Sequence, residues 1–109
     1  MQSERRRATR YNFGAIAEVI DIGHPNGVVS LTRDLSLVGV FVKTPILLTK
    51  GAKVGVKIRH SGADFTAIGK VTGNITSEGM GVEFTRMEPT DRAVLEEWLG
   101  LTAKVSDAS

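Results

Sequence analysis

Apolar residues in the middle of the chain recur in short runs with the two-residue period of β-strands. The clearest run covers residues 53–59, where Val54, Val56 and Ile58 alternate with lysine, glycine and arginine. This alternation is typical of a strand with one buried and one solvated face. Turn-forming residues separate the runs, and Asn26-Gly27 is the strongest hairpin signal among them. The pattern predicts six strands, over residues 15–20, 28–32, 39–43, 53–59, 65–71 and 81–84.

Six short strands at spacings of about ten residues, with turns between them, are typical of a small antiparallel sandwich or barrel. Gly55, Gly69 and Gly73 lie inside strand-like runs, and we expect them to mark bends or bulges where a barrel turns its corners. Most of the aromatic side chains are expected in the core. They are Phe41, Phe65, Phe84 and Trp98.

The period changes to that of an amphipathic helix after Pro89. Thr90 or Asp91 is expected to cap the N-terminus of this helix, and Gly100 is placed to end it. The apolar residues that share one helical face are Val94, Leu95, Trp98 and Leu99. The predicted fold class is therefore all-β with one C-terminal helix.

The chain has 109 residues, which fits a single domain. We expect a flexible basic leader over residues 1–12, a β-barrel over 13–86, and a helix with a polar tail over 87–109. The absence of cysteine excludes thiolate catalysis, cysteine-based zinc sites and disulfides. No apolar run approaches the roughly 20 residues of a membrane span. The N-terminus also lacks the apolar stretch of a signal peptide, so we expect a cytoplasmic location without membrane insertion.

Positive charge is concentrated at the N-terminus, although the formal net charge is only +2. Four arginines lie in the first ten residues, namely Arg5, Arg6, Arg7 and Arg10. A basic arm on a nearly neutral body indicates an anionic partner, and guanidinium groups make paired hydrogen bonds to phosphate and to guanine. The alternative is a solvated basic terminus with no binding role.

A second candidate for chemistry is the segment Asp34-Leu35-Ser36-Leu37-Val38-Gly39. Residues two apart on an extended segment point the same way, so Asp34 and Ser36 would share one surface. Gly39 would allow a positive φ angle or the close approach of a ligand. The alternative is a tight connection between two strands, in which Asp34 and Ser36 bond to local backbone amides.

Taken together, the two segments resemble the PilZ domain family in their order and spacing. The matching motifs are Arg6-x-x-x-Arg10 and Asp34-x-Ser36-x-x-Gly39. Residues 79–84, Gly-Met-Gly-Val-Glu-Phe, and the helix after them also resemble the end of a PilZ barrel. The resemblance extends from Arg5 to about Leu99. It implies a six-stranded antiparallel β-barrel, and PilZ domains are bacterial receptors for the second messenger cyclic di-GMP.

The resemblance also implies a set of ligand contacts. The corresponding positions are Arg5, Arg6, Arg10, Asp34, Ser36 and Gly39. The motif arginines would clamp phosphates and guanine Hoogsteen edges, the Asp and Ser would contact a guanine, and Arg5 would accompany an intercalated ligand dimer. This chain departs from the family at Gly73 and Asn74, near the position where many members carry an aromatic residue on which a guanine stacks. Stacking would then have to come from arginine.

The implied function is a stand-alone cyclic di-GMP receptor and adaptor that regulates a protein partner, with no cofactor and no metal. Catalysis is not expected, because His24 and His60 lie beside turn-type residues and no third group is placed to orient either as a base. Two alternatives stay open: a PilZ-fold adaptor with weak or no ligand binding, and a small nucleic-acid-binding barrel. The second is disfavoured because aromatic residues make up only 6% of the chain, and such barrels hold single strands by stacking.

Overall fold

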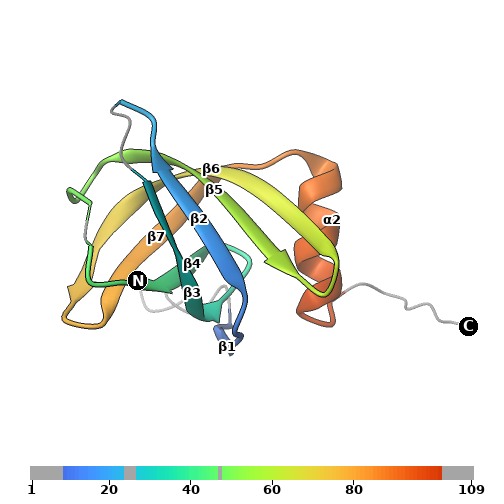
Figure 1. Ribbon diagram of the computed structural model, residues 1–109. Helices are drawn as coiled ribbons and strands as arrows, with labels where there is room; N and C mark the ends of the chain where they lie inside the picture. The colour runs from blue at the N-terminus through green and yellow to red at the C-terminus, as the bar shows by residue number, and fades with distance from the viewer. Residues whose placement is uncertain (1–8, 24–26, 47, 102–109) are drawn as a thin grey trace, which may run out of the picture.

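The computed structural model describes residues 9–23, 27–46 and 48–101. Its elements lie close to the runs read from the sequence, and Figure 1 shows the strands curling around one another with the helix beside them. In chain order they are β1 (Tyr11–Asn12), β2 (Ile16–Asp21), β3 (Gly27–Leu35), β4 (Gly39–Lys43), β5 (Lys53–His60), β6 (Ala63–Thr76), β7 (Gly79–Arg86) and α2 (Pro89–Trp98).

Strands β2 to β7 form a closed antiparallel barrel. They follow one another in the order β3-β2-β5-β6-β7-β4, and β4 pairs with β3 to complete the circle. Closure gives each of these six strands a hydrogen-bonded neighbour on both sides, whereas an open sheet would expose two edge strands. The six-stranded antiparallel barrel predicted from the sequence is confirmed.

The barrel interior is filled by the alternating apolar residues. In β5, Val54, Val56 and Ile58 are each at most 1% exposed, so the strand buries the face that its pattern predicts. Helix α2 packs beside β6 and adds buried Leu95 to the same core. Trp98 packs against this core, with its ring centroid 5.4 Å from that of Phe65.

The two ends of α2 differ in how well the sequence predicts them. Glu88 is the N-cap and Pro89 opens the helix, so the prediction that Thr90 or Asp91 caps it is wrong. Proline suits the first helical position because its φ is already helical and it has no N–H to leave unsatisfied. Asp91 instead accepts a hydrogen bond of 3.0 Å from the backbone N–H of Thr66 in β6. Gly100 has a φ of 72° and ends the helix as predicted.

The predicted glycine bulges are confirmed at two of three positions. Strand β6 runs over 14 residues, and its pairing with β7 shifts register between Ile68 and Gly69 and again between Val71 and Ile75, a stretch that includes Gly73. These irregularities let one long strand bend around the barrel. Gly55 is not a bulge, because β5 pairs in unbroken register with both of its neighbours.

A short strand outside the closed ring precedes the predicted boundary at residue 13. Tyr11 and Asn12 form β1, which pairs with the end of β3, at Asp34 and Leu35. Strand β2 pairs with the earlier part of β3. The break between β1 and β2 is bridged by the buried hydroxyl of Thr32, which accepts a 2.9 Å hydrogen bond from the Ala15 N–H and donates to the Phe13 carbonyl. The remainder of the predicted flexible leader, residues 1–8, lies outside the described residues.

Candidate functional site

The Asp34 motif lies where β3 ends and β4 begins. Strand β3 continues to Leu35, three residues past its predicted end, and the β3–β4 pairing shifts register between Thr32 and Asp34. Leu35 points into the core, so its neighbour Asp34 faces the outside of the barrel. Strand pairing places Asn12 of β1 directly opposite Asp34. This pairing brings Arg10, which lies just before β1, next to the motif.

Asp34 forms ion pairs with two guanidinium groups. Nε and Nη2 of Arg10 both lie 2.9 Å from Oδ1 of Asp34, and Nε of Arg33 lies 3.0 Å from Oδ2. The Asp34 side chain is 12% exposed, whereas that of Arg10 is 44% exposed. The structure therefore joins the two sequence motifs through one carboxylate, across 24 residues of chain.

Arg33 was not predicted as part of this cluster. Its guanidinium carbon lies 3.8 Å from the centroid of the Phe41 ring, and its Nη1 lies 3.0 Å from Oε1 of Glu78. The hydrogen bond to Asp34, helped by the one to Glu78, raises the pKa of Arg33 above its usual value. Phe41 is fully buried, as predicted, but it does not belong to the cluster inside the barrel. Val40 and Val42 point into the barrel, so the Phe41 ring between them lies on the outer side, beneath Arg33.

Ser36 is fully buried, and its hydroxyl is engaged within the β3–β4 turn. It accepts hydrogen bonds from the N–H groups of Val38 (3.1 Å) and Gly39 (3.2 Å), and it lies 3.3 Å from the Gly39 carbonyl, to which it donates. This is the turn-capping alternative considered for the segment, realised for Ser36 but not for Asp34. Contact between Ser36 and a ligand stays a prediction.

Strands β4 and β7 approach each other so closely at Gly39 that a side chain does not fit there. The backbone of Gly39 is not left-handed, so the expectation of a positive φ is wrong. A Cβ atom at this position would lie 2.5 Å from the carbonyl oxygen of Val82 in β7, which is closer than real Cβ contacts. The absence of a side chain lets β4 and β7 pair tightly and leaves the outer surface flat there.

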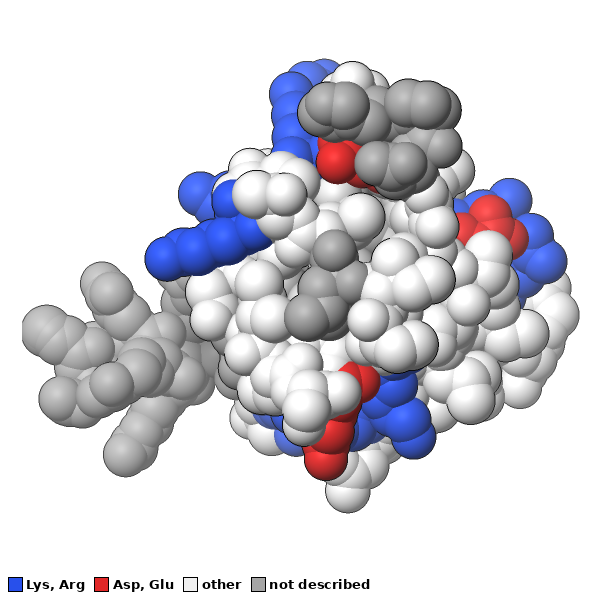
Figure 2. All heavy atoms as spheres, turned by 60° about the vertical axis from the view of Figure 1, so that its left-hand side comes forward, with Lys and Arg blue, Asp and Glu red and all other residues white. Residues whose placement is uncertain are grey.

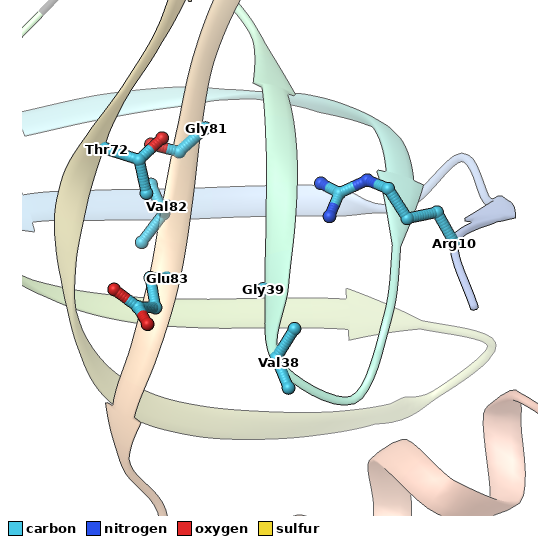
Figure 3. Close-up of a pocket in the computed structure, with 7 residues that line it drawn as sticks. All are labelled: Arg10, Val38, Gly39, Thr72, Gly81, Val82 and Glu83. Carbon is cyan, nitrogen blue, oxygen red and sulfur yellow. The ribbon is translucent and has the colours of Figure 1, made fainter. Parts of the chain in front are cut away.

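A hollow of about 370 Å³ lies on the outer surface over this flat region. Its lining residues come from the segment before β1, the β3–β4 turn, β4, β6 and β7, and they are Arg10, Val38, Gly39, Thr72, Gly81, Val82 and Glu83. We call it the glycine hollow. Figure 3 shows Arg10 on one side of β4, Thr72 and Glu83 on the other side, and Gly39 between them. A glycine floor with a guanidinium at one wall and a carboxylate at the other suits a flat, polar, anionic ligand.

A second hollow, of about 460 Å³, adjoins the first. It lies between the β3–β4 turn and the start of α2, and we call it the helix groove. Leu37, Phe84 and Met87 give it apolar walls, and Arg92 adds a cation. Val38 lines both hollows.

The predicted site residues fall into two groups. Arg10, Asp34, Ser36 and Gly39 come together around the glycine hollow or the turn beside it. Arg5 and Arg6 lie outside the described residues. Thr72 and Glu83 were not predicted as site residues. Glu83 lies within the predicted strand over 81–84, whereas Thr72 lies just beyond the predicted strand over 65–71.

The face of the barrel drawn in Figure 2 is largely uncharged, with Lys and Arg at its margins and Asp or Glu beside several of them. Ion pairs on the barrel surface as a whole include Arg59 with Glu18, at 2.7 Å, and Arg33 with Glu78, at 3.0 Å. Among the described residues drawn in Figure 2, Lys and Arg do not form the continuous basic stripe typical of a nucleic-acid-binding surface. Among the residues that the structure describes, no helix is long and apolar enough to cross a bilayer, and no group of three or more acidic, His or Cys side chains could hold a metal ion.

Comparisons with known proteins agree with this architecture. The family model described as PilZ domain matches residues 4–101. No curated protein sequence matches this chain. Among solved structures, the Bacillus subtilis inhibitor of motility MotI/DgrA is 14% identical with a TM-score of 0.73, and the match covers 95% of this chain and 54% of MotI/DgrA. This chain thus spans about half the length of that relative.

Two further structures match over nearly their whole length. The PilZ domain of CeSA from a cellulose-synthesizing bacterium is 21% identical, with a TM-score of 0.65, over 85% of this chain and 97% of that one. The PilZ domain of Escherichia coli YcgR, solved with c-di-GMP, is 16% identical, with a TM-score of 0.67, over 93% and 94% of the two chains. At these identities the likeness concerns the fold.

Proposed function

Because this chain belongs to the PilZ domain family, we propose that it is a receptor for cyclic di-GMP and binds this nucleotide at the glycine hollow. The YcgR domain, which has the same fold, was solved with c-di-GMP. The ligand carries two phosphates and two guanines, so its binding needs cationic donors, acceptors for guanine N–H groups and a flat surface for the rings.

The observation that carries this proposal is the position of Arg10. Its guanidinium lines the glycine hollow while it is held 2.9 Å from Asp34, and its side chain is still 44% exposed. The ion pair orients the planar fork before any ligand arrives, which reduces the entropy lost on binding. Arg6 supplies the second arginine of the motif, and Arg5 stacks between guanines if two ligand molecules bind.

The second part of the proposal concerns signalling. Bound phosphates neutralise the arginines of the leader and draw it over the barrel face that carries Asp34. A surface with a free basic arm is thereby replaced by one with less charge and a fixed shape. A protein partner in the cytoplasm that recognises only one of these surfaces is then regulated by the nucleotide.

Calorimetric titration of the whole chain with cyclic di-GMP tests the proposal. We expect saturable binding, and we expect Arg10→Ala to weaken it about ten- to a hundredfold, because it removes charged hydrogen bonds worth about 1.5–3 kcal/mol. Arg92→Ala is the matched control, since its side chain is 45% exposed and also forms an ion pair, with Glu96, but does not line the glycine hollow. Absence of binding by the unmodified chain would refute the proposal, and equal binding by both variants would refute the role of Arg10.

A further inference from the structure

We infer that Glu83 reads the Watson–Crick edge of a guanine and makes the glycine hollow selective for guanine over other purines. This inference rests on the proposed function, because it concerns the base of the nucleotide bound there. It assigns a role in specificity to a residue outside both sequence motifs.

The side chain of Glu83 is directed to the outside of the barrel, at the wall of the hollow opposite Arg10. Met80 and Val82 of β7 point into the core, so the alternation of the strand turns Gly81 and Glu83 outward. In register, Glu83 stands directly across from Gly39, the glycine that flattens the floor. Figure 3 shows its carboxylate on the far side of β4 from the Arg10 guanidinium.

The carboxylate of Glu83 is available to a ligand. Within the described part of the chain, no hydrogen bond or ion pair engages it, even though Lys70 of β6 lies opposite in register. The acids Asp34 and Glu78 in the same region are both held by arginine. Among the described residues, both carboxylate oxygens of Glu83 are therefore available as acceptors.

A carboxylate without a cationic partner is unexpected in a site for an anionic ligand, so its presence there calls for a chemical explanation. Close to a phosphate it would be repelled, so its favourable partners are the N–H groups of the ligand. Guanine presents two adjacent donors, N1–H and the N2 amine, which match the two oxygens of a carboxylate. Adenine presents a bare N1 acceptor there and has no N2 amine, so the same carboxylate would face a lone pair. Hypoxanthine keeps N1–H but lacks the amine.

Arg10 and Glu83 can contact different edges of the same guanine. A guanidinium donates to the O6 and N7 acceptors on the Hoogsteen edge of guanine, and a carboxylate accepts on its Watson–Crick edge. Each such paired contact discriminates against a wrong base by roughly five- to 150-fold. The glycine floor between the two side chains leaves room for the ring itself.

The test is calorimetric titration of the whole chain with cyclic di-GMP, cyclic di-AMP and cyclic di-IMP, the hypoxanthine analogue. We compare the unmodified protein, Glu83→Gln, and the control Glu88→Gln, which removes the same charge from an exposed residue outside the hollow. We expect the unmodified protein to prefer cyclic di-GMP over both analogues by about fivefold or more. Glu83→Gln should lose most of this preference, chiefly by weaker binding of cyclic di-GMP, and the control should keep it. Because the Glu83 carboxylate has no partner to lose, the variant should melt at the temperature of the unmodified protein.

The outcomes separate this inference from the proposed function. If the unmodified chain binds none of the three nucleotides, the proposed function fails and this inference fails with it. If the unmodified chain binds cyclic di-GMP and Glu83→Gln keeps both its affinity and its preference, only the inference is overturned. Equal weakening of all three nucleotides by Glu83→Gln also overturns it, because the contact would then be to the sugar or phosphate they share.

Discussion

Replacing Gly39 by alanine tests the role of close strand approach in this barrel. The added Cβ would lie 2.5 Å from the Val82 carbonyl oxygen, whereas ordinary van der Waals contact begins at 3.4 Å. Strands β4 and β7 would therefore have to separate by roughly 0.9 Å at the point where Gly39 pairs with Glu83. The obstacle is a backbone atom in a closed barrel, so it cannot rotate away as a side chain could.

The expected cost follows from two opposing effects. Forcing extra volume into a well-packed position typically costs about 1–3 kcal/mol. Replacing glycine by alanine also restricts the unfolded chain, which returns about 0.4–1 kcal/mol. We therefore expect a net loss of about 1–2 kcal/mol, which lowers the melting temperature of a domain of this size by roughly 5–15 °C.

Two other glycines provide the comparison. Gly55 also lies within a strand, but a Cβ atom there would meet nothing within 4 Å, so Gly55→Ala should leave the melting temperature unchanged or raise it slightly. Gly79→Ala should be the most damaging of the three, because its Cβ would lie 1.9 Å from the Val42 carbonyl oxygen. Thermal melts followed by circular dichroism rank the variants. If Gly39→Ala melted together with Gly55→Ala, the steric argument would be wrong.

Two further predictions concern the polar groups around the motif. Asp34→Asn should lower the free energy of unfolding by about 1–2 kcal/mol, because it weakens the charged hydrogen bonds to Arg10 and Arg33. Water partly screens these bonds, since the two arginine side chains are 44% and 42% exposed. An unchanged midpoint of unfolding in urea would contradict this prediction. Thr32→Val should cost about 1–3 kcal/mol in the same assay, because the buried N–H that its hydroxyl satisfies would be left without a partner. Thr32→Ser keeps the hydroxyl and should cost clearly less, and equal losses for the two variants would assign the effect to packing.

The strands could be predicted because their apolar positions repeat every two residues. The run around Val56 buries the residues that its alternation indicates, and the apolar face of α2 likewise packs against the core. The predicted strand ended at residue 71 because no apolar residue lies between Val71 and Ile75, although β6 continues to Thr76 with shifted register.

The candidate site was predicted only as far as its motifs extend along the chain. The pairing of Arg10 with Asp34 depends on β1 lying against the end of β3, and a two-residue strand leaves no periodic signal. Glu83 reaches the glycine hollow because β7 pairs with β4, which is a property of barrel closure rather than of local sequence. The burial of Phe41 was predicted, but its place on the outer side of the barrel was not, because a strand pattern does not distinguish a buried outer side chain from an inner one.

The β3–β4 turn acts as a partition between two compartments. Val38 lines both the glycine hollow and the helix groove, so this residue belongs to the wall of each. The turn that carries it is braced by the hydroxyl of Ser36, which is bonded to the backbone at Val38 and Gly39. Displacing this wall toward one side takes volume from one compartment and gives it to the other. If a molecule in the helix groove displaced this wall and changed the affinity of the glycine hollow for a ligand, reciprocity of linked equilibria would require that ligand to change the affinity of the groove by the same factor.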